Sequence, residues 1–231
     1  MKKKQSGAKM MMILTAILLG IIAIFVVINH KSSETSNQAN EGTSGGKTPS
    51  IEGQPILGEK DAPVTVVEFG DFKCPSCNVW GETVFPKLVD DYVKGGKVKF
   101  AYVNVLFHGQ ESTLASLAAE SVWKHSPDAY WDFHKAIYKE QPEQVKHDEA
   151  WVTNERLVEI AKKFPAINVE QLQQDLEKQQ FIDEVKKDEK LVREFGVNKT
   201  PTIMVNGHVL KDPFDYEKIK SLIEKELEAG K

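Results

Sequence analysis

The chain has 231 residues, 41% of them hydrophobic, and a formal net charge of −4. This length and apolar content are enough for one well-packed domain together with a tail or an insertion. The sequence contains no basic stripe and no nucleic-acid-binding motif, which argues against a nucleic-acid partner.

An uncharged, strongly apolar stretch, Met10 to Asn29, follows four lysines within residues 1–9. About 20 such residues span a bilayer as a helix. The positive-inside rule then places the N-terminus in the cytoplasm and the rest of the protein outside. We expect residues 1–30 to be a cytoplasmic stub and an anchor in the cell membrane. A cleaved signal peptide is the alternative, although its apolar region is shorter; both place the domain in an oxidising compartment.

Residues 31–50 are rich in Ser, Asn, Gly and Thr and contain almost no apolar side chain. A segment of this composition cannot bury a core. We expect it to be a flexible linker that holds the folded domain away from the membrane.

The two cysteines of the chain occur in a single Cys-Pro-Ser-Cys motif, at the junction between two predicted elements. The β-branched run Val64–Phe69 before the motif predicts a buried strand. Apolar residues at helical spacing after it predict a helix that begins at Pro75, since proline is favoured at the first helical position. Pro86 should kink this helix, and Gly95 and Gly96 should end it.

A second apolar run, Lys97–Val105, predicts another strand. Strand, helix and strand in this order form a β-α-β unit, which requires parallel pairing and a right-handed crossover. Cys74 then lies at the first turn of the helix, where unpaired backbone N–H groups and the helix dipole favour negative charge. We expect its thiol to ionise more easily than a free cysteine, with Lys73 adding to the effect.

Two other interpretations of the cysteine pair stay open. A zinc site needs more ligands than one cysteine pair, and the histidines of the chain form no close cluster in the sequence. A purely structural disulfide would close a very small loop, and small loops gain little from a cross-link. A redox-active pair fits the spacing better than either.

Most of residues 110–195 carries apolar side chains at helical spacing, which predicts a subdomain of several helices. Thr153 is a suitable helix cap, and Asn168 with a glutamine three positions later has the pattern of a capping box. Gly196 should end the last helix. His134 lies in this segment, and we interpret it as a satisfied core histidine rather than a ligand.

Strand signals return near the C-terminus. Apolar runs at residues 202–205 and 208–210 flank Asn206 and Gly207, and an Asn-Gly pair in this setting is the strongest short-range signal for a β-hairpin. A closing helix is expected from Asp215 to Leu227 because its apolar residues recur on one side.

Three local motifs resemble those of one known family: residues 66–77 (VVEFGDFKCPSC), residues 102–109 (YVNVLFHG) and residues 195–207 (FGVNKTPTIMVNG). Together with the order of elements, they make the chain resemble the DsbA family of extracytoplasmic thiol oxidases, most closely its membrane-anchored Gram-positive BdbD type. The resemblance covers residues 51–230. It implies an α/β thioredoxin fold, a central mixed sheet flanked by helices, formed by residues 51–109 and 196–231. Residues 110–195 would be a helical insertion.

The resemblance also implies roles for individual residues. Cys74 would be the exposed sulfur that exchanges with substrates, and Cys77 the buried resolving sulfur. Thr200 and Pro201 match the site where this family holds a substrate strand beside the disulfide, with Pro201 in the cis form. Glu68 lies where the fold keeps a buried acid, which would relay a proton to Cys77; an acid tolerated in the core for other reasons is the alternative.

The function implied is the donation of disulfide bonds to exported proteins that arrive unfolded or reduced. A substrate thiolate would attack Cys74, and a second substrate thiolate would resolve the mixed disulfide. Ser76 stands where the best-known members carry histidine, which leaves the oxidising strength open. A reductase or isomerase with the same motif is one alternative, and a non-enzymatic chaperone or peptide-binding module is another.

A quinone-linked membrane oxidoreductase of the DsbB type is the partner that the resemblance implies for reoxidation. No cofactor is implied beyond the redox disulfide of Cys74 and Cys77, and we expect a monomer. An acidic extracellular domain also leaves room for a structural divalent cation, although no ligand set is readable in the sequence.

Overall fold

The structure, a computed structural model, describes residues 46–142 and 150–230. The predicted stub, the predicted anchor and most of the predicted linker therefore lie outside the described residues. Within those two ranges, no helix is both long and apolar enough to cross a membrane. The end of the predicted linker, residues 46–50, lies on the folded domain, where Lys47 forms an ion pair with Glu194.

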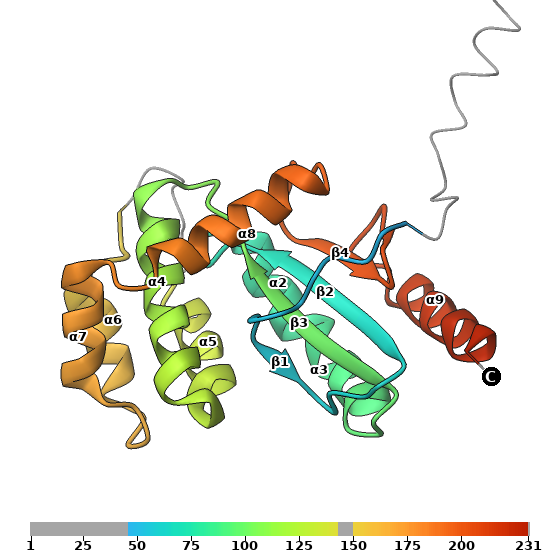
Figure 1. Ribbon diagram of the computed structural model, residues 1–231, viewed down its shortest axis with the longest axis horizontal. Helices are drawn as coiled ribbons and strands as arrows, with labels where there is room; N and C mark the ends of the chain where they lie inside the picture. The colour runs from blue at the N-terminus through green and yellow to red at the C-terminus, as the bar shows by residue number, and fades with distance from the viewer. Residues whose placement is uncertain (1–45, 143–149, 231) are drawn as a thin grey trace, which may run out of the picture. The chain divides into compact units, whose positions relative to one another are not determined.

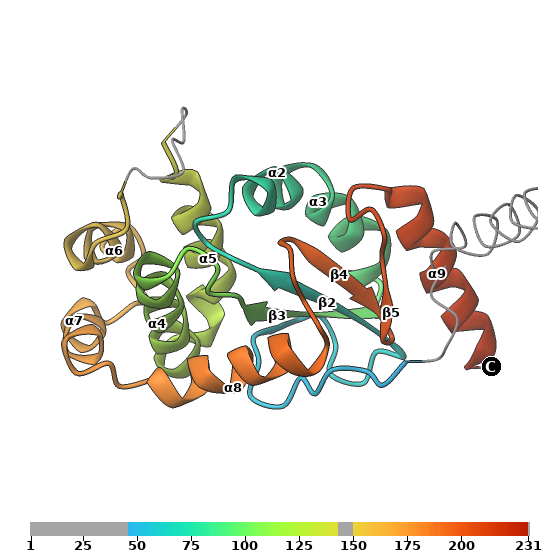
Figure 2. The ribbon, with the colours of Figure 1, turned by 90° about the horizontal axis from the view of Figure 1, so that it is seen from above.

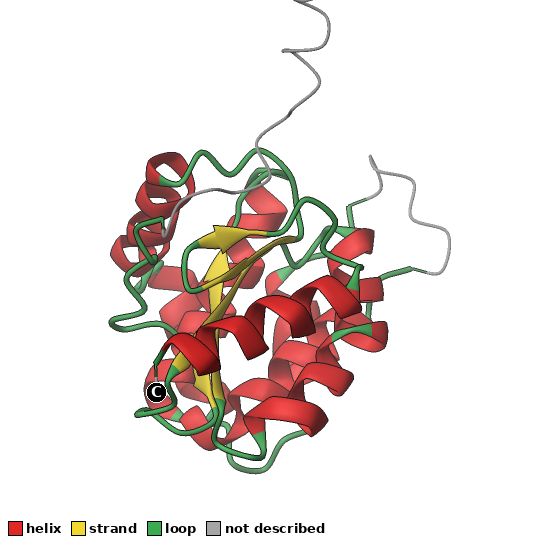
Figure 3. Cartoon of the chain, turned by 90° about the vertical axis from the view of Figure 1, so that its right-hand side faces the viewer, coloured by secondary structure: helices red, strands yellow, loops and turns green. Residues whose placement is uncertain are grey.

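A five-stranded mixed sheet forms the centre of the fold (Figures 1 and 3). Its strands are β1 (Ile56–Leu57), β2 (Val64–Gly70), β3 (Val98–Asn104), β4 (Thr202–Val205) and β5 (His208–Val209). Their order across the sheet is β1-β3-β2-β4-β5. β2 and β3 pair in parallel, with Val64 opposite Val98, and the other neighbouring pairs are antiparallel. The predicted β-α-β unit, hairpin and thioredoxin fold are confirmed.

Helices cover both faces of this sheet. They are α2 (Pro75–Thr83), α3 (Phe85–Leu88), the π-helix η1 (Val89–Val93), α4 (Gln110–His125), the 3-10 helix η2 (Pro127–Ala129), α5 (Tyr130–Lys139), α6 (Asn154–Ala161), α7 (Val169–Lys178), α8 (Ile182–Glu194) and α9 (Tyr216–Ala229). α2 and α3 lie over one face, and α8 runs across the other (Figure 2). α4 to α7 gather on one side of the sheet in both views.

The alternation of side chains along β2 divides the core into two layers. Val66 packs in a cluster with Trp80 of α2, whereas Val67 packs with apolar residues of α8. Glu68 follows Val66 by two positions, so its side chain points to the α2 face. The strand therefore directs one carboxyl group toward the helix that carries the cysteines.

The helix after the cysteines is interrupted just before the kink that was predicted at Pro86. α2 ends at Thr83 and α3 begins at Phe85, so the break lies at Val84 and not at Pro86. Pro86 occupies an early position of α3, where its missing N–H group costs no helical hydrogen bond. The chain starts a new helical segment around the proline instead of bending one helix.

The predicted helix ends in the inserted segment are confirmed. Thr153 accepts a hydrogen bond from the backbone N–H of Arg156 at the start of α6. Asn168 accepts one from the N–H of Gln171 at the start of α7. Gly196, which follows α8, has a φ of +61°, a conformation that glycine adopts without steric cost.

Candidate active site

The two cysteines lie where β2 passes into α2. Cys74 is the N-cap of α2 and is 7% exposed, whereas Cys77 is fully buried. Both are present as free thiols. The backbone N–H of Asp71 approaches Cys77 Sγ at 3.5 Å. Both cysteines are thus buried, Cys77 more completely than Cys74; their roles as attacking and resolving groups stay predictions.

The loop before β4 brings Thr200 and Pro201 to the cysteines. Cys74 Sγ lies 3.5 Å from the carbonyl oxygen of Thr200, although 126 positions separate the two residues in the sequence. The peptide bond between Thr200 and Pro201 is cis, as predicted. The role of these two residues in holding a substrate strand stays a prediction.

Hydrogen bonds lower the pKa of Cys74 well below that of a free cysteine, to about 5. The Cys77 thiol makes the largest contribution, while burial acts in the opposite direction. The side chain of Thr200 and the backbone N–H groups of Cys77 and Ser76 lower the pKa further. Cys74 is therefore a thiolate at neutral pH.

Lys73, next to Cys74, is paired with an acidic residue of α4. Its side chain is buried, and its ammonium group forms an ion pair with Glu111 of α4. Glu111 also accepts hydrogen bonds from the backbone N–H groups of Trp151 and Val152. Lys73 is not among the groups with the largest effect on the pKa of Cys74. Glu111 compensates the charge of Lys73, and an effect of Lys73 on the thiolate stays a prediction.

Glu68 and Cys77 both have a raised pKa. Burial is the largest cause of the rise at Glu68, and the negative charge of Cys74 adds to it. Burial is also the largest cause at Cys77, followed by the hydrogen bond with Cys74 and the charge of Glu68. The site therefore combines one ionised sulfur with a carboxyl group and a second thiol whose protonated forms burial favours.

A buried aspartate that the sequence analysis did not single out joins the cysteine loop to the loop after β3. The carboxylate of Asp71 accepts hydrogen bonds from the N–H of Lys73, the hydroxyl of Ser112 and the N–H groups of Phe107 and His108. The ring nitrogen Nδ1 of His108 lies 2.8 Å from the same carboxylate. Asp71 and His108 belong to two of the motifs that carry the family resemblance, but only the fold shows that they meet.

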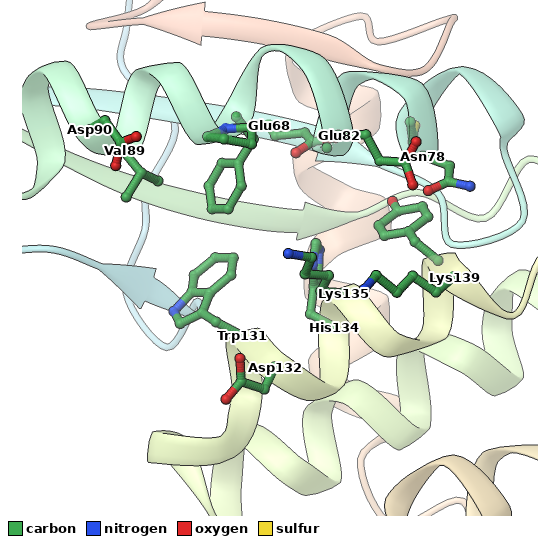
Figure 4. A pocket seen from close by; sticks show the side chains of 15 residues that line it. Glu68, Asn78, Glu82, Val89, Asp90, Trp131, Asp132, His134, Lys135 and Lys139 are labelled. Carbon is green, nitrogen blue, oxygen red and sulfur yellow. The ribbon is translucent and has the colours of Figure 1, made fainter. Parts of the chain in front are cut away.

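A pocket of about 260 Å³ lies behind the cysteines, between α2, α3 and η1 on one side and α5 on the other. Figure 4 shows side chains of α5, including Trp131 and His134, directed toward α2 and α3 across this space. Glu68 and Cys77 also line the pocket. Glu68 Oε1 and His134 Nε2 have no hydrogen-bond partner in the part of the chain that the structure describes. His134 is therefore not the satisfied core histidine that we expected.

Residues 50–225 match the sequence family described as thioredoxin. This chain belongs to the thioredoxin family. Within it, the chain is 48% identical over 192 residues to disulfide bond formation protein D of Bacillus subtilis, a match covering 83% of this chain and 84% of that protein. It is 38% identical over 212 residues to the probable disulfide bond formation protein D of Bacillus anthracis, covering 91% and 90%.

Solved structures agree with this family assignment. The crystal structure of oxidised BdbD from Bacillus subtilis matches with a TM-score of 0.76 and 49% identity, covering 79% of this chain and 97% of that chain. DsbA of Chlamydia trachomatis matches with a TM-score of 0.66 and 25% identity, covering 74% and 90%. This member of the thioredoxin family is a thiol-disulfide oxidoreductase with a DsbA-like fold, and the predicted family is confirmed.

Four polar side chains form one buried, hydrogen-bonded cluster: Gln54, Asn104, Glu120 and Asp188. Their oxygen atoms are the candidate ligands for the divalent cation that the sequence left open. Gln54 Oε1 and Asn104 Oδ1 lack hydrogen-bond partners among residues 46–142 and 150–230. Carboxylate and amide oxygens are what a hard cation such as Ca²⁺ takes. In the same ranges, no group of three or more His, Cys, Asp or Glu side chains is arranged for a metal. A divalent cation was left open by the sequence and stays open.

Proposed function

We propose that this protein is an oxidase that donates disulfide bonds to exported proteins outside the cytoplasm. The observation that carries the proposal is the pKa of Cys74, which hydrogen bonds lower to about 5. A stable thiolate favours the reduced form of the protein, so the Cys74–Cys77 disulfide of the oxidised form is the stronger oxidant. The names of the relatives, disulfide bond formation protein D, support the same direction of electron flow.

The reaction uses the two sulfurs in different ways. A substrate thiolate attacks Cys74 Sγ, the Cys74–Cys77 bond breaks, and Cys77 leaves and is protonated because its pKa is raised. A second substrate thiolate attacks the substrate sulfur of the mixed disulfide, and Cys74 leaves as a thiolate. Two electrons pass from substrate to protein. Thr200 and Pro201 lie beside Cys74, in a position to bind the extended substrate segment.

The reduced protein then needs an oxidant. We propose a quinone-linked membrane oxidoreductase of the DsbB type, with this protein anchored beside it by residues 10–29. The support is the uncharged apolar segment that follows four lysines, together with the similarity to BdbD. The catalytic domain would lie outside the cell membrane as a monomer. Recovery from the culture medium of a mature form lacking residues 1–30 would contradict the anchor.

The equilibrium of the full-length protein with glutathione tests the direction of electron flow. We expect a reduction potential well above the value of about −270 mV found for thioredoxin, toward the value of about −120 mV of a strong oxidant. A Cys74→Ser variant is the control, since it cannot form the redox disulfide. A potential at or below that of thioredoxin would contradict the oxidase and favour the reductase alternative.

The relative stability of the two redox forms gives a second test, with a defined dependence on pH. The pKa of Cys74 falls from about 8.5 in a free cysteine to about 5 in the folded reduced protein. The reduced form therefore gains stability that is fully present above pH 8.5 and is lost as the pH falls through 5. In thermal melts we expect the reduced form to be the more stable at pH 8 and its advantage to shrink toward pH 5. A more stable oxidised form at pH 8 would refute this.

A further inference from the structure

We propose that the pocket behind the cysteines is the path by which Cys77 exchanges protons with solvent, and that His134 positions the water that serves Glu68. This inference rests on the proposed redox function. It assigns a task to a histidine of the inserted helices, which the cysteine chemistry described above does not use.

Cys77 needs a proton path because it is enclosed. When a substrate thiolate opens the disulfide, Cys77 leaves as a thiolate in a place where burial and Glu68 oppose a negative charge. The backbone N–H of Asp71, 3.5 Å from the sulfur, stabilises the thiolate but does not offset the effect of burial on its pKa. A proton must therefore reach Cys77 from a neighbouring acid.

Glu68 and His134 bring unpaired polar atoms to the same pocket that Cys77 lines. Glu68 is 2% exposed and His134 is 8% exposed, and within the described ranges neither Oε1 nor Nε2 has a protein partner. Leaving such atoms unpaired is costly, by about 1–3 kcal/mol each. A pocket of about 260 Å³ is large enough for several waters, each of which occupies about 30 Å³ in the liquid. Water held there would satisfy both atoms.

The pocket connects this buried group to solvent. Its mouth is formed by exposed charged side chains from α2, η1 and α5: Glu82, Asp90, Asp132, Lys135 and Lys139. Acids and lysines are mixed at the mouth (Figure 4), so no one sign of charge excludes a hydronium or hydroxide ion. At the buried end, Tyr138 also lines the pocket, and the thiolate of Cys74 acts electrostatically on Glu68.

His134 is suited to hold water without adding charge. Burial lowers its pKa to about 3, so its ring is neutral at physiological pH. A neutral imidazole offers one donor and one acceptor nitrogen. The ring packs edge-on against Tyr102 at 4.6 Å and Phe72 at 5.1 Å between centroids, which fixes its orientation. His134 is thus a positioning residue, and Glu68 is the group that carries the proton.

The Cys77 thiolate takes the proton of the Glu68 carboxyl group. The Glu68 carboxylate takes a proton from the water that His134 holds, and solvent replaces that proton through the mouth of the pocket. When the protein is reoxidised, the proton of Cys77 leaves by the same groups in reverse order.

Two substitutions of His134 separate its polarity from its packing. His134→Phe keeps an aromatic ring and removes the nitrogens, whereas His134→Gln keeps a polar end. The measurement is the rate at which dithiothreitol reduces the oxidised full-length protein in detergent, from pH 5 to 9, in H₂O and D₂O. We expect His134→Phe to be about tenfold slower at pH 7, with a larger isotope effect, and His134→Gln to stay within about twofold of the wild type.

Gly81 offers a test that leaves the polar groups unchanged. It lies in α2 and lines the pocket, and an added Cβ atom would meet nothing within 4 Å. Gly81→Leu should occupy part of the pocket and slow the reduction, as His134→Phe does. Gly81→Ala is the matched control, since it adds one methyl group and should retain the rate.

Wild-type rates, pH profiles and isotope effects in both His134→Phe and Gly81→Leu would overturn the inference. If His134 is purely structural, His134→Phe will change the melting temperature without changing the pH profile or the isotope effect. That result would also contradict the inference. If the wild-type protein itself does not exchange with dithiothreitol, the proposed function fails. If the wild type exchanges and the variants match it, only the proton path fails.

Discussion

The ammonium group of Lys73 is buried next to the reactive cysteine, and the carboxylate of Glu111 from α4 compensates it. Glu111 in turn accepts hydrogen bonds from the backbone N–H groups of Trp151 and Val152. At the scale of single residues, this pair ties the cysteine loop to the inserted helices. The charge of Lys73 thus stabilises the fold through its ion pair. The pKa of Cys74 is lowered mainly by hydrogen bonds from Cys77 and from the start of the helix.

Replacing Lys73 separates these two tasks. We expect Lys73→Met to leave the pKa of Cys74 near 5 and to lower the free energy of unfolding by about 1–3 kcal/mol, because Glu111 loses its buried partner. Thiolate absorbance against pH and urea denaturation measure the two quantities. Lys94→Met, in the exposed pair with Asp90, is the control and should cost less than about 1 kcal/mol. A rise of one unit or more in the pKa of Cys74 would show that the lysine does tune the thiolate.

The β4–β5 hairpin has a glycine that its turn and its neighbours both require. Gly207 has a φ of +82°, and a Cβ atom there would overlap the carbonyl oxygen of Gly46. The start of the described chain therefore lies directly on the turn. At the scale of elements, the hairpin predicted from Asn206 and Gly207 also packs against Gly46 and Lys47. No pattern in the sequence near these residues predicts that contact.

Two glycines with similar backbones make this testable. Gly53 has a φ of +84°, and a Cβ atom there would meet nothing within 4 Å. We expect Gly53→Ala to lower the free energy of unfolding by about 1–2 kcal/mol through backbone strain alone. Gly207→Ala should cost a further 1–3 kcal/mol or so because of the overlap. Equal values in urea denaturation would mean that residues 46–47 do not pack on the hairpin.

At the scale of the whole molecule, one buried aspartate connects three distant parts of the chain. Asp188 of α8 accepts hydrogen bonds from Gln54 Nε2 at 2.6 Å and from Asn104 Nδ2 at 2.7 Å. The backbone N–H of Asn104 also donates to it, at 3.0 Å. These contacts fasten the segment before β1, the end of β3 and the last inserted helix to one another.

Removing this carboxylate should loosen the insertion from the sheet. We expect Asp188→Ala to lower the free energy of unfolding by about 3 kcal/mol or more, since several buried donors lose a charged acceptor. The exposed Asp183 of the same helix provides the control, and Asp183→Ala should change stability by about 0.5 kcal/mol or less. Urea denaturation followed by near-ultraviolet circular dichroism makes the comparison. Similar values for both variants would show that the cluster does not hold the domain together.

Local features of this protein follow from the sequence alone because they depend on residues a few positions apart. The strand before Cys74, the helix after it, the cap at Asn168 and the turn at Asn206-Gly207 are of this kind. Propensity, capping and φ preferences act within one turn of chain. The break at Val84 instead of Pro86 shows the limit of this reasoning. A proline can either kink a helix or stand near the start of a new one, and the local sequence does not choose between them.

Contacts between distant segments were decided by the tertiary structure. Thr200 contacts Cys74, and Glu111 pairs with Lys73, because the fold brings distant segments together. For the same reason Glu68 and His134 line one pocket. Motif resemblance placed Cys74, Cys77 and Pro201 in advance. It did not show that Lys73 is paired or that His134 lacks a partner. The environment of a buried charge or polar atom depends on which other elements pack there, and that information is not local to any stretch of the sequence.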